Sequence, residues 1–309
     1  KWFKRLWFRG CISLLNMSPI YKQKSILFKF LSIFSVVRIY NILIIVLAQY
    51  LTSIFILSDK KLLDVIFDFN LFLLIICSSL SIASGYIINN FYDQKKDIIN
   101  KPIKSKIDDV LKNSTKLYFY FFLNFVVIFF ASIISLRAII FFSVYIFFLW
   151  FYSHKLKRLL FLGNLFYSLL TITPFFAILL YYKNIDLIIA AYALFLFFIL
   201  LLKDLTKDLK NLIGDFSENY QTIPVVFGED FSRIIISLIT FINVILIINL
   251  FINFSDGYMN IYYAISLILL LIFTIKLYNS KKVSDYLELH NILRLIIGLG
   301  VFSIILLEI

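Results

Sequence analysis

Long apolar runs separated by short polar stretches repeat along the whole chain. The runs are rich in Ile, Leu, Phe, Val and Tyr, and many approach the ~20 residues that a helix needs to cross a bilayer. They do not alternate apolar and polar residues over ~10 positions, as the strands of a membrane barrel do. The pattern therefore predicts an all-α, polytopic membrane bundle of about nine transmembrane helices, at residues 33–57, 70–92, 116–136, 138–153, 161–182, 185–208, 231–254, 259–279 and 290–308.

The third and fourth of these helices are separated by almost no chain, so a tight hairpin is expected between them. Composition agrees with a membrane protein, because 62% of the residues are hydrophobic and the mean hydropathy is +0.95. Two cysteines and two histidines are too few and too scattered for a disulfide framework or a Cys/His metal cluster.

The basic residues are distributed unevenly between the two sides of the predicted bundle. With the N-terminus in the cytosol, the outer side holds only Lys60, Lys61, Arg137 and Lys183 of the 30 Lys and Arg residues. Such a bias follows the positive-inside rule and predicts a cytosolic N-terminus, with the loops after helices 2, 4, 6 and 8 also cytosolic. The net charge of +12 is then explained by anionic lipid head groups and an anionic substrate, without nucleic acid.

The first 30 residues form a basic N-terminal segment, followed by a transmembrane domain over residues 31–309. The chain as given begins with Lys1, and Met17 is a plausible start, which would make residues 1–16 an upstream extension. Alternatively, this segment is a basic amphipathic stretch that lies on the membrane surface.

Two of the expected cytosolic connections contain most of the acidic residues. The first reads NNFYDQKKD at residues 89–97, and the second reads DLTKDLKNLIGD at residues 204–215. In both, polar residues recur at i, i+3 and i+7, and such offsets share one helix face. The candidate metal ligands on these faces are Asn89, Asn90, Asp93 and Asp97 in the first motif and Asp208, Asn211 and Asp215 in the second.

Carboxylates stacked on one helix face repel each other unless a cation or water lies among them. Mg²⁺ is the natural cation, because it is held by one or two carboxylates together with phosphate oxygens of a substrate. Two such faces meeting across a cavity could bind a diphosphate through Mg²⁺ and stabilise it as a leaving group. Nearby lysines that could contact the remaining oxygens are Lys101, Lys155, Lys157 and Lys207.

Simpler interpretations stay open at this point. A single charged loop between membrane helices is usually only solvated, although two loops with matching spacing favour a site. A transporter would carry acids near the bilayer midplane between structural repeats, whereas these acids lie at helix ends. The distance of 118 residues between the motifs suggests an internal duplication.

At these residues the chain resembles the UbiA superfamily of intramembrane prenyltransferases. The family's first motif is N-D-x-x-D-x-x-x-D and its second is D-x-x-D-x-x-x-D, to be compared with NNFYDQKKD and with DLKNLIGD at residues 208–215. Further similarity lies in INKP at 99–102, TIPVVFG at 222–228, RIYN at 38–41 and YSHKLKRLLFLGN at 152–164. Asn90 and Asn211 stand where the family has Asp, so a non-catalytic relative that binds isoprenoid lipid is an alternative.

The resemblance implies a prenyltransferase domain of nine helices that uses Mg²⁺. The donor would be a prenyl diphosphate and the partner a hydrophobic acceptor, in an integral protein of the cytoplasmic (inner) membrane. Asp93, Asp97, Asp208 and Asp215 would be catalytic residues that bind Mg²⁺ and diphosphate with Asn89, and Asp204 would be a base or a supporting group. The implied substrate-binding residues are Arg38, Asn41, Asn89, Tyr152, Lys155, Lys157, Lys101 and Lys207.

The INKP stretch is most similar to the branch that contains geranylgeranylglycerol-phosphate geranylgeranyltransferase, an ether-lipid enzyme. This branch implies geranylgeranylglyceryl phosphate as the acceptor. Aromatic acceptors of quinone synthesis are the alternative, and the haem-farnesylating branch fits less well because its extended first motif is missing.

Overall fold

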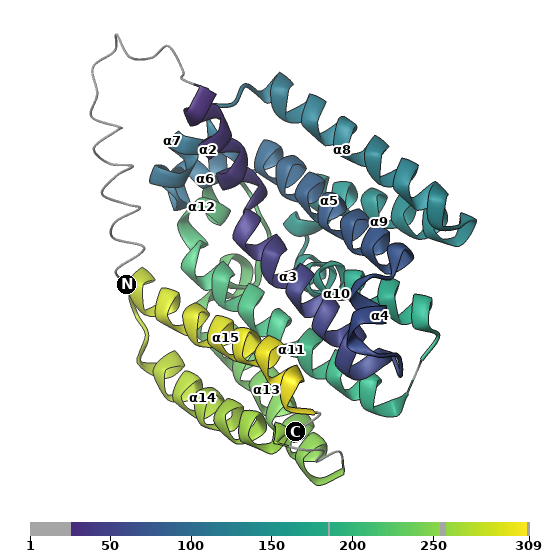
Figure 1. Cartoon of the computed structure of the whole chain (residues 1–309). Helices are drawn as coiled ribbons and strands as arrows, with labels where there is room; N and C mark the ends of the chain where they lie inside the picture. The colour runs from purple at the N-terminus through teal and green to yellow at the C-terminus, as the bar shows by residue number, and fades with distance from the viewer. Residues whose placement is uncertain (1–25, 185, 254–257, 308–309) are drawn as a thin grey trace.

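The computed structural model describes residues 26–184, 186–253 and 258–307, and all regular structure in these ranges is helical (Figure 1). Nine helices in the described part are long and apolar enough to cross a membrane, which confirms the predicted polytopic bundle. Residues 1–25, including Met17, lie outside the described residues. The elements are α2 (Ile26–Val37), α3 (Ile39–Thr52), the π-helix η2 (Ser53–Leu57), α4 (Leu62–Ile66), α5 (Phe69–Tyr92), α6 (Gln94–Asn100), α7 (Pro102–Asp108), α8 (Asn113–Ile134), α9 (Leu136–His154), η3 (Leu156–Arg158), α10 (Leu162–Tyr182), α11 (Leu187–Lys210), α12 (Leu212–Ser217), α13 (Ile223–Asn253), α14 (Met259–Asn279), α15 (Val283–Ser303) and η4 (Ile304–Leu307).

The expected hairpin between the third and fourth spans has a single residue at its turn. Ser135 lies between the end of α8 and the start of α9, and its backbone is extended, with φ −176° and ψ 162°. The Ser135 hydroxyl oxygen accepts a hydrogen bond of 3.1 Å from the Ala138 N–H. The serine thus caps α9 at a terminus where backbone donors lack helical partners.

Three spans differ from the sequence-based expectation. The first is divided at Arg38, whose φ of 53° and ψ of 52° are left-handed and end α2 one residue before α3 begins. The seventh starts earlier, at Ile223, and Gly228, with φ 85° and ψ 172°, interrupts it near its start. The last starts at Val283 rather than 290. In the seventh and last spans, polar residues near the start of the helix lower the local hydropathy. The hydropathy pattern therefore missed the first helical turns, which precede the apolar run.

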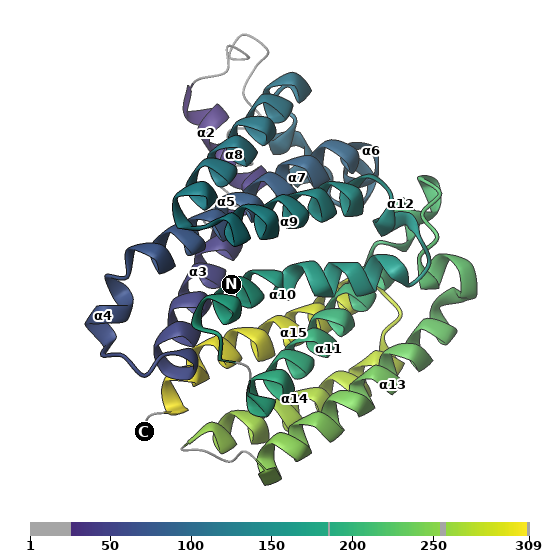
Figure 2. The same ribbon diagram turned by 90° about the vertical axis from the view of Figure 1, so that its right-hand side faces the viewer.

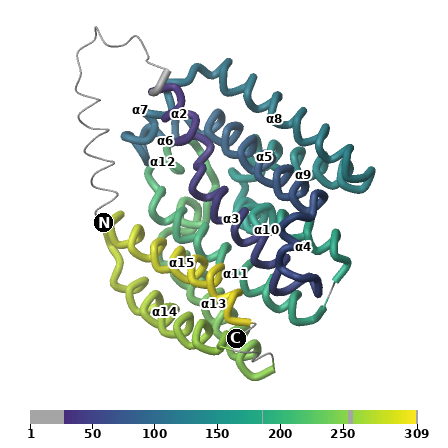
Figure 3. Tube along the Cα trace, in the orientation of Figure 1, coloured from purple at the N-terminus to yellow at the C-terminus, as the bar shows by residue number. Residues whose placement is uncertain are grey.

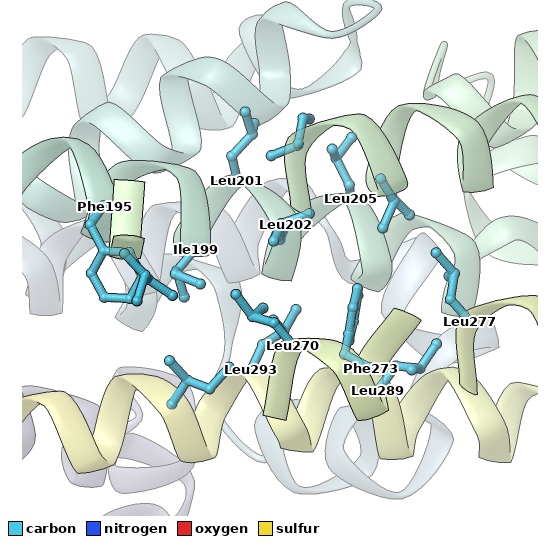
Figure 4. Close-up of a cluster of buried hydrophobic side chains, with 14 of the residues drawn as sticks. Phe195, Ile199, Leu201, Leu202, Leu205, Leu270, Phe273, Leu277, Leu289 and Leu293 are labelled. Carbon is cyan, nitrogen blue, oxygen red and sulfur yellow. The ribbon is translucent and has the colours of Figure 1, made fainter. Parts of the chain in front are cut away.

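The helices pack as two groups with α10 between them (Figure 2). In one group α5 packs against α8 and α9, and its small residues allow close approach: a Cβ on Gly85 would lie 3.1 Å from the Leu149 side chain. In the other group α11 packs against α13 and α15, and Figure 4 shows Leu202 and Leu205 near Phe273 and Leu289 in this buried cluster.

The two groups also meet through elements far apart in the sequence. Figure 3 shows the last long helix, α15, running beside α3, and contacts join these two helices. The short helices α6, α7 and α12 lie together at one end of the bundle, with α4 at the opposite end (Figures 1 and 2). We call the first of these the motif end, because both acidic motifs lie there.

A proline inside α10 leaves a backbone acceptor that other helices satisfy. Pro174 has no N–H, so the Leu170 carbonyl four residues earlier has no helical donor. The Tyr145 hydroxyl donates to this carbonyl at 3.1 Å, and the Gln49 amide donates to the Pro174 carbonyl at 3.0 Å. In lipid such interhelical bonds are needed, because no water is present to replace them.

Candidate active site

Both acidic motifs have the same backbone break at the same position. Asp93 ends α5 with φ −92° and ψ 4°, and Asn211 ends α11 with φ −100° and ψ 10°. A short helix follows in each case, α6 after Asp93 and α12 after Asn211. The matched spacing read from the sequence thus corresponds to a repeated structural unit, although each motif turns at its middle residue instead of continuing as one straight helix.

The two short helices contact each other directly. The Lys96 ammonium of α6 lies 2.7 Å from the Asp215 carboxylate of α12, and the Gly214 N–H donates a hydrogen bond of 3.2 Å to the Asn100 side chain. A Cβ at position 214 would lie too close to the Asn100 side-chain amide, so a larger residue there would displace this side chain and disturb the hydrogen bond. The motifs, more than 100 residues apart in sequence, therefore form one cluster.

The acid at the middle of the first motif is held by three groups. Lys157 and the Tyr220 hydroxyl each donate to the same Asp93 oxygen at 2.7 Å, and Lys157 also donates to the Asn89 side-chain oxygen at 3.2 Å. Burial alone would raise the pKa of Asp93, but Lys157 and Lys96 outweigh burial and hold this pKa well below its usual value. Asp93 therefore stays a carboxylate.

The second motif is organised by an asparagine on α10. The Asn164 side-chain amide donates to Asp204 at 3.0 Å and to Asp208 at 2.7 Å. Lys207 forms an ion pair with Asp204 and lies 5.0 Å from the centre of the Tyr167 ring. Tyr152 is close enough to Asp204 and Lys207 to interact with their charges.

Arg38 and the last acid of the first motif complete the cluster. Asp97 pairs with Lys101 at 2.9 Å, and Arg38 is close enough to Asp97 for their charges to interact. The Arg38 guanidinium lies 4.9 Å from the centre of the Tyr86 ring, whose hydroxyl accepts a 3.2 Å hydrogen bond from Asn41. A left-handed arginine between two helices is a strained conformation of the kind that clusters at functional sites.

Two of the predicted site residues, Lys155 and Asn90, do not face the acids of the cluster. Lys155 is exposed at the end of α9, one residue before η3 turns Lys157 inward. The Asn90 side-chain amide donates at 2.9 Å to Asp108 of α7, away from the other acids, while its carbonyl oxygen is buried without a hydrogen bond among the described residues. Asn211 is also buried with an unbonded carbonyl oxygen.

The donor set suits Mg²⁺ held jointly with a phosphate ligand. Among the described residues, no group of three His, Cys, Asp or Glu side chains is close enough to hold a metal alone. The unbonded Asn211 oxygen and Asp215 offer hard oxygen ligands, and burial raises the pKa of Asp215 in spite of Lys96. A further positive charge beside Asp215 would therefore stabilise its carboxylate form.

Sequence reasoning assigned no role to three residues of the cluster, Lys96, Asn164 and Tyr220. Asn164 ends the YSHKLKRLLFLGN segment, so the quoted resemblance could have pointed to it. Lys96 occupies an unspecified position of the first motif, and Tyr220 follows the second motif by five residues in a loop without a spacing signal. Only the three-dimensional contacts reveal these two.

An apolar cavity of about 220 Å³ lies between the helices of the bundle. It is lined by α3, η2, α10, α11, α14, α15 and η4, and its wall includes Ile44, Thr171 and Leu200. Leu200 precedes Asp204 by about one helical turn, or about 6 Å along α11. A ligand with a charged head at the motif end could therefore place an apolar tail in the cavity.

Residues 27–306 match the model of the UbiA prenyltransferase family, and the chain belongs to this family. It is 29% identical over 255 residues to a digeranylgeranylglyceryl phosphate synthase of Methanobrevibacter smithii, covering 77% of this chain and 89% of that protein. It is 30% identical over 160 residues to the protein of the same name from Thermococcus gammatolerans, covering 52% of this chain and little more than half, 57%, of that protein.

Solved structures show the same fold. A structure of a digeranylgeranylglyceryl phosphate synthase in membranes superposes with a TM-score of 0.67 at 20% identity, covering 90% of this chain and 98% of that chain. A UbiA homologue from Archaeoglobus fulgidus bound to GPP and Mg²⁺ gives a TM-score of 0.65 at 15% identity, covering 88% of this chain and 99% of that chain. The apolar helices and the family together make this chain an integral membrane protein.

Proposed function

We propose that this protein transfers a prenyl group from a prenyl diphosphate to geranylgeranylglyceryl phosphate, with Mg²⁺ bound at the motif end. The observation that carries the proposal is the contact between the two acidic motifs, Lys96 to Asp215, in a bundle whose apolar cavity reaches Leu200, four residues before Asp204 on α11. The relatives named digeranylgeranylglyceryl phosphate synthase support the choice of acceptor, and the homologue bound to GPP and Mg²⁺ supports the donor and the ion.

Asp93, Asp97, Asp208 and Asp215 are the proposed ligands of Mg²⁺ and diphosphate, with Asn89 and Asn211 as neutral oxygen donors. Mg²⁺, when bound, neutralises the negative charge that develops on the departing diphosphate. The lysines and Arg38 around these acids contribute further positive charge to the same oxygens. The buried position of the cluster strengthens these interactions relative to water.

The proposed reaction breaks the allylic C–O bond of the donor, and the electron pair leaves with the diphosphate. The hydroxyl oxygen of the acceptor then forms a new C–O bond to the allylic carbon and loses its proton. Asp204 is the motif acid nearest the cavity lining, four residues after Leu200 on α11, and it is the residue proposed to accept this proton. The prenyl tail lies in the apolar cavity during the reaction.

The motif end is proposed to face the cytosol in the cytoplasmic membrane. The excess of basic residues on this side of the bundle supports the orientation through the positive-inside rule. It also brings the site to the compartment in which anionic, water-exposed diphosphate head groups and Mg²⁺ are available.

Mass spectrometry of the lipid product tests the proposal. Purified protein in liposomes receives labelled geranylgeranyl diphosphate, Mg²⁺ and either geranylgeranylglyceryl phosphate or an aromatic acceptor such as hydroxybenzoate. A labelled ether of the glyceryl phosphate is expected. A prenylated aromatic product alone would move the protein to the aromatic-acceptor class, and the absence of any Mg²⁺-dependent product with any acceptor would contradict a transferase.

A further inference from the structure

Lys96 is a buried cation in the middle of an acidic motif. Its side chain belongs to α6, and the residue is only 8% exposed. Its ammonium is 2.7 Å from Asp215, which is completely buried, and 4.0 Å from the centre of the Tyr220 ring. Lys95, the preceding residue, is exposed to solvent. Turning Lys96 inward is therefore a specific feature of α6 and not a general consequence of a basic loop.

We propose that Lys96 is a positioning residue that occupies the cation position at Asp215 and holds α6 against α12 until a metal–diphosphate ligand displaces its ammonium. This inference rests on the proposed function. Since Lys96 lies within the first motif and Asp215 within the second, the ion pair bridges the two halves of the site. It keeps the halves in register before any ligand is bound.

The surroundings of Asp215 support a role as a temporary partner. Neither Asp215 oxygen accepts a hydrogen bond from the described residues, and its buried charge is compensated by the Lys96 ion pair and by the charge of Lys207. A buried carboxylate whose oxygens accept no hydrogen bonds recovers little of its desolvation cost from ion pairs alone. A divalent ion at the same oxygens would stabilise it better, because the attraction grows with the charge.

The rest of the interface explains how Lys96 can leave without separating the helices. The Asn100–Gly214 hydrogen bond joins the same two helices and involves no charge. The Tyr220 ring beside Lys96 also donates its hydroxyl proton to Asp93, so this ring links the two motifs independently of Lys96. The lysine is therefore free to exchange with a ligand while α6 and α12 remain in contact.

The proposal predicts opposite effects for two substitutions. In Lys96→Met the side chain keeps its length and loses its charge. No ammonium then competes with the metal for the Asp215 carboxylate, and the metal should bind about 10-fold more tightly. In Lys96→Arg the planar guanidinium can hold Asp215 through two hydrogen bonds, so the metal should bind about 10-fold more weakly. Lys95→Met is the matched control and should bind the metal as the wild type does.

Titration of the purified full-length protein with Mn²⁺, with and without inorganic pyrophosphate, measures these affinities by electron paramagnetic resonance. Thermal unfolding of the same samples provides a second readout. We expect Lys96→Met to melt at a lower temperature than the wild type without metal, and to gain more from added Mn²⁺ than the wild type gains. Lys96→Arg should retain the wild-type melting temperature without metal, so it tests the proposal even if Lys96→Met does not fold.

Two outcomes separate this inference from the proposed function. If the wild type binds Mn²⁺ with pyrophosphate but Lys96→Arg binds it equally well or more tightly, Lys96 is only a structural ion pair and the inference is overturned. If the wild type binds no Mn²⁺ even with pyrophosphate, the proposed function itself is contradicted, and the inference falls with it.

Discussion

The side-chain amide of Asn90 donates a hydrogen bond of 2.9 Å to the carboxylate of Asp108, a residue that is 1% exposed. Asp108 also accepts a 2.7 Å hydrogen bond from Ser35 of α2 and pairs with Lys104 at 2.5 Å. Asn90 thus links the first motif to α7 and α2. The asparagine that departs from the family pattern has a defined structural partner, and it need not be a sign of a decayed metal site.

Asn90→Asp is expected to destabilise the protein by about 1–3 kcal/mol, because it replaces a donor with a second carboxylate beside Asp108. Thermal unfolding in detergent measures the loss. In the double variant with Asp108→Asn the donor and acceptor are exchanged, and much of the stability should return. An equally stable or more stable single variant with a lower Mg²⁺ requirement would instead favour a decayed site restored by the acid.

Tyr220→Phe is expected to raise the Mg²⁺ concentration for half-maximal turnover about 3- to 10-fold. The substitution removes the hydroxyl that orients Asp93 but keeps the ring beside Lys96, so the fold should lose only about 1 kcal/mol. Turnover measured against Mg²⁺ concentration checks this. Tyr118→Phe, at an exposed tyrosine of α8, is the control, and an unchanged Mg²⁺ requirement in Tyr220→Phe would remove the hydroxyl from the site.

Tyr145→Phe is expected to cost about 1–2 kcal/mol, because the Leu170 carbonyl beside Pro174 would lose its donor inside the membrane. In a Pro174→Ala background the alanine N–H can bond this carbonyl, and the same substitution should then cost much less. Unfolding free energies of the four proteins form a double-mutant cycle. Equal costs in both backgrounds would show that the tyrosine does not compensate for the proline.

Ala193→Phe is expected to discriminate between donors of different length. Ala193 lines the apolar cavity on α11, and a phenyl ring there would fill much of its 220 Å³. KM for geranylgeranyl diphosphate should rise about 10-fold or more, while KM for the shorter geranyl diphosphate changes little. Ala190→Phe, a few residues away on an exposed position of α11, is the control. Equal effects on both donors would place the tail elsewhere.

The nine spans and the placement of both acidic motifs at the same end of the bundle were predictable, because apolar runs and the number of spans between the motifs can be read along the chain. Apolar runs fix the helices in lipid, and helical spacing fixes which polar residues share a face. The breaks at Arg38 and Asp93 were not predictable, since neither residue is a glycine or a proline and tertiary contacts hold each conformation. The burial of Lys96 was also not predictable, because the neighbouring Lys95 has the same charge but is exposed to solvent. The partner of Asn90 lies in a separate helix, α7, which no spacing rule connects to the motif.

The central claim is that the two acidic motifs act as one site, and pyrophosphate release by proteoliposomes tests it most directly. Asp93→Asn and Asp208→Asn each remove one charge from a different motif, and each should lower kcat about 100-fold or more while the protein remains monodisperse. Asp230→Asn, at a side chain that is 93% exposed, should keep wild-type activity. Wild-type turnover in either motif variant, or release by the wild type that does not require Mg²⁺, would contradict a shared Mg²⁺–diphosphate site.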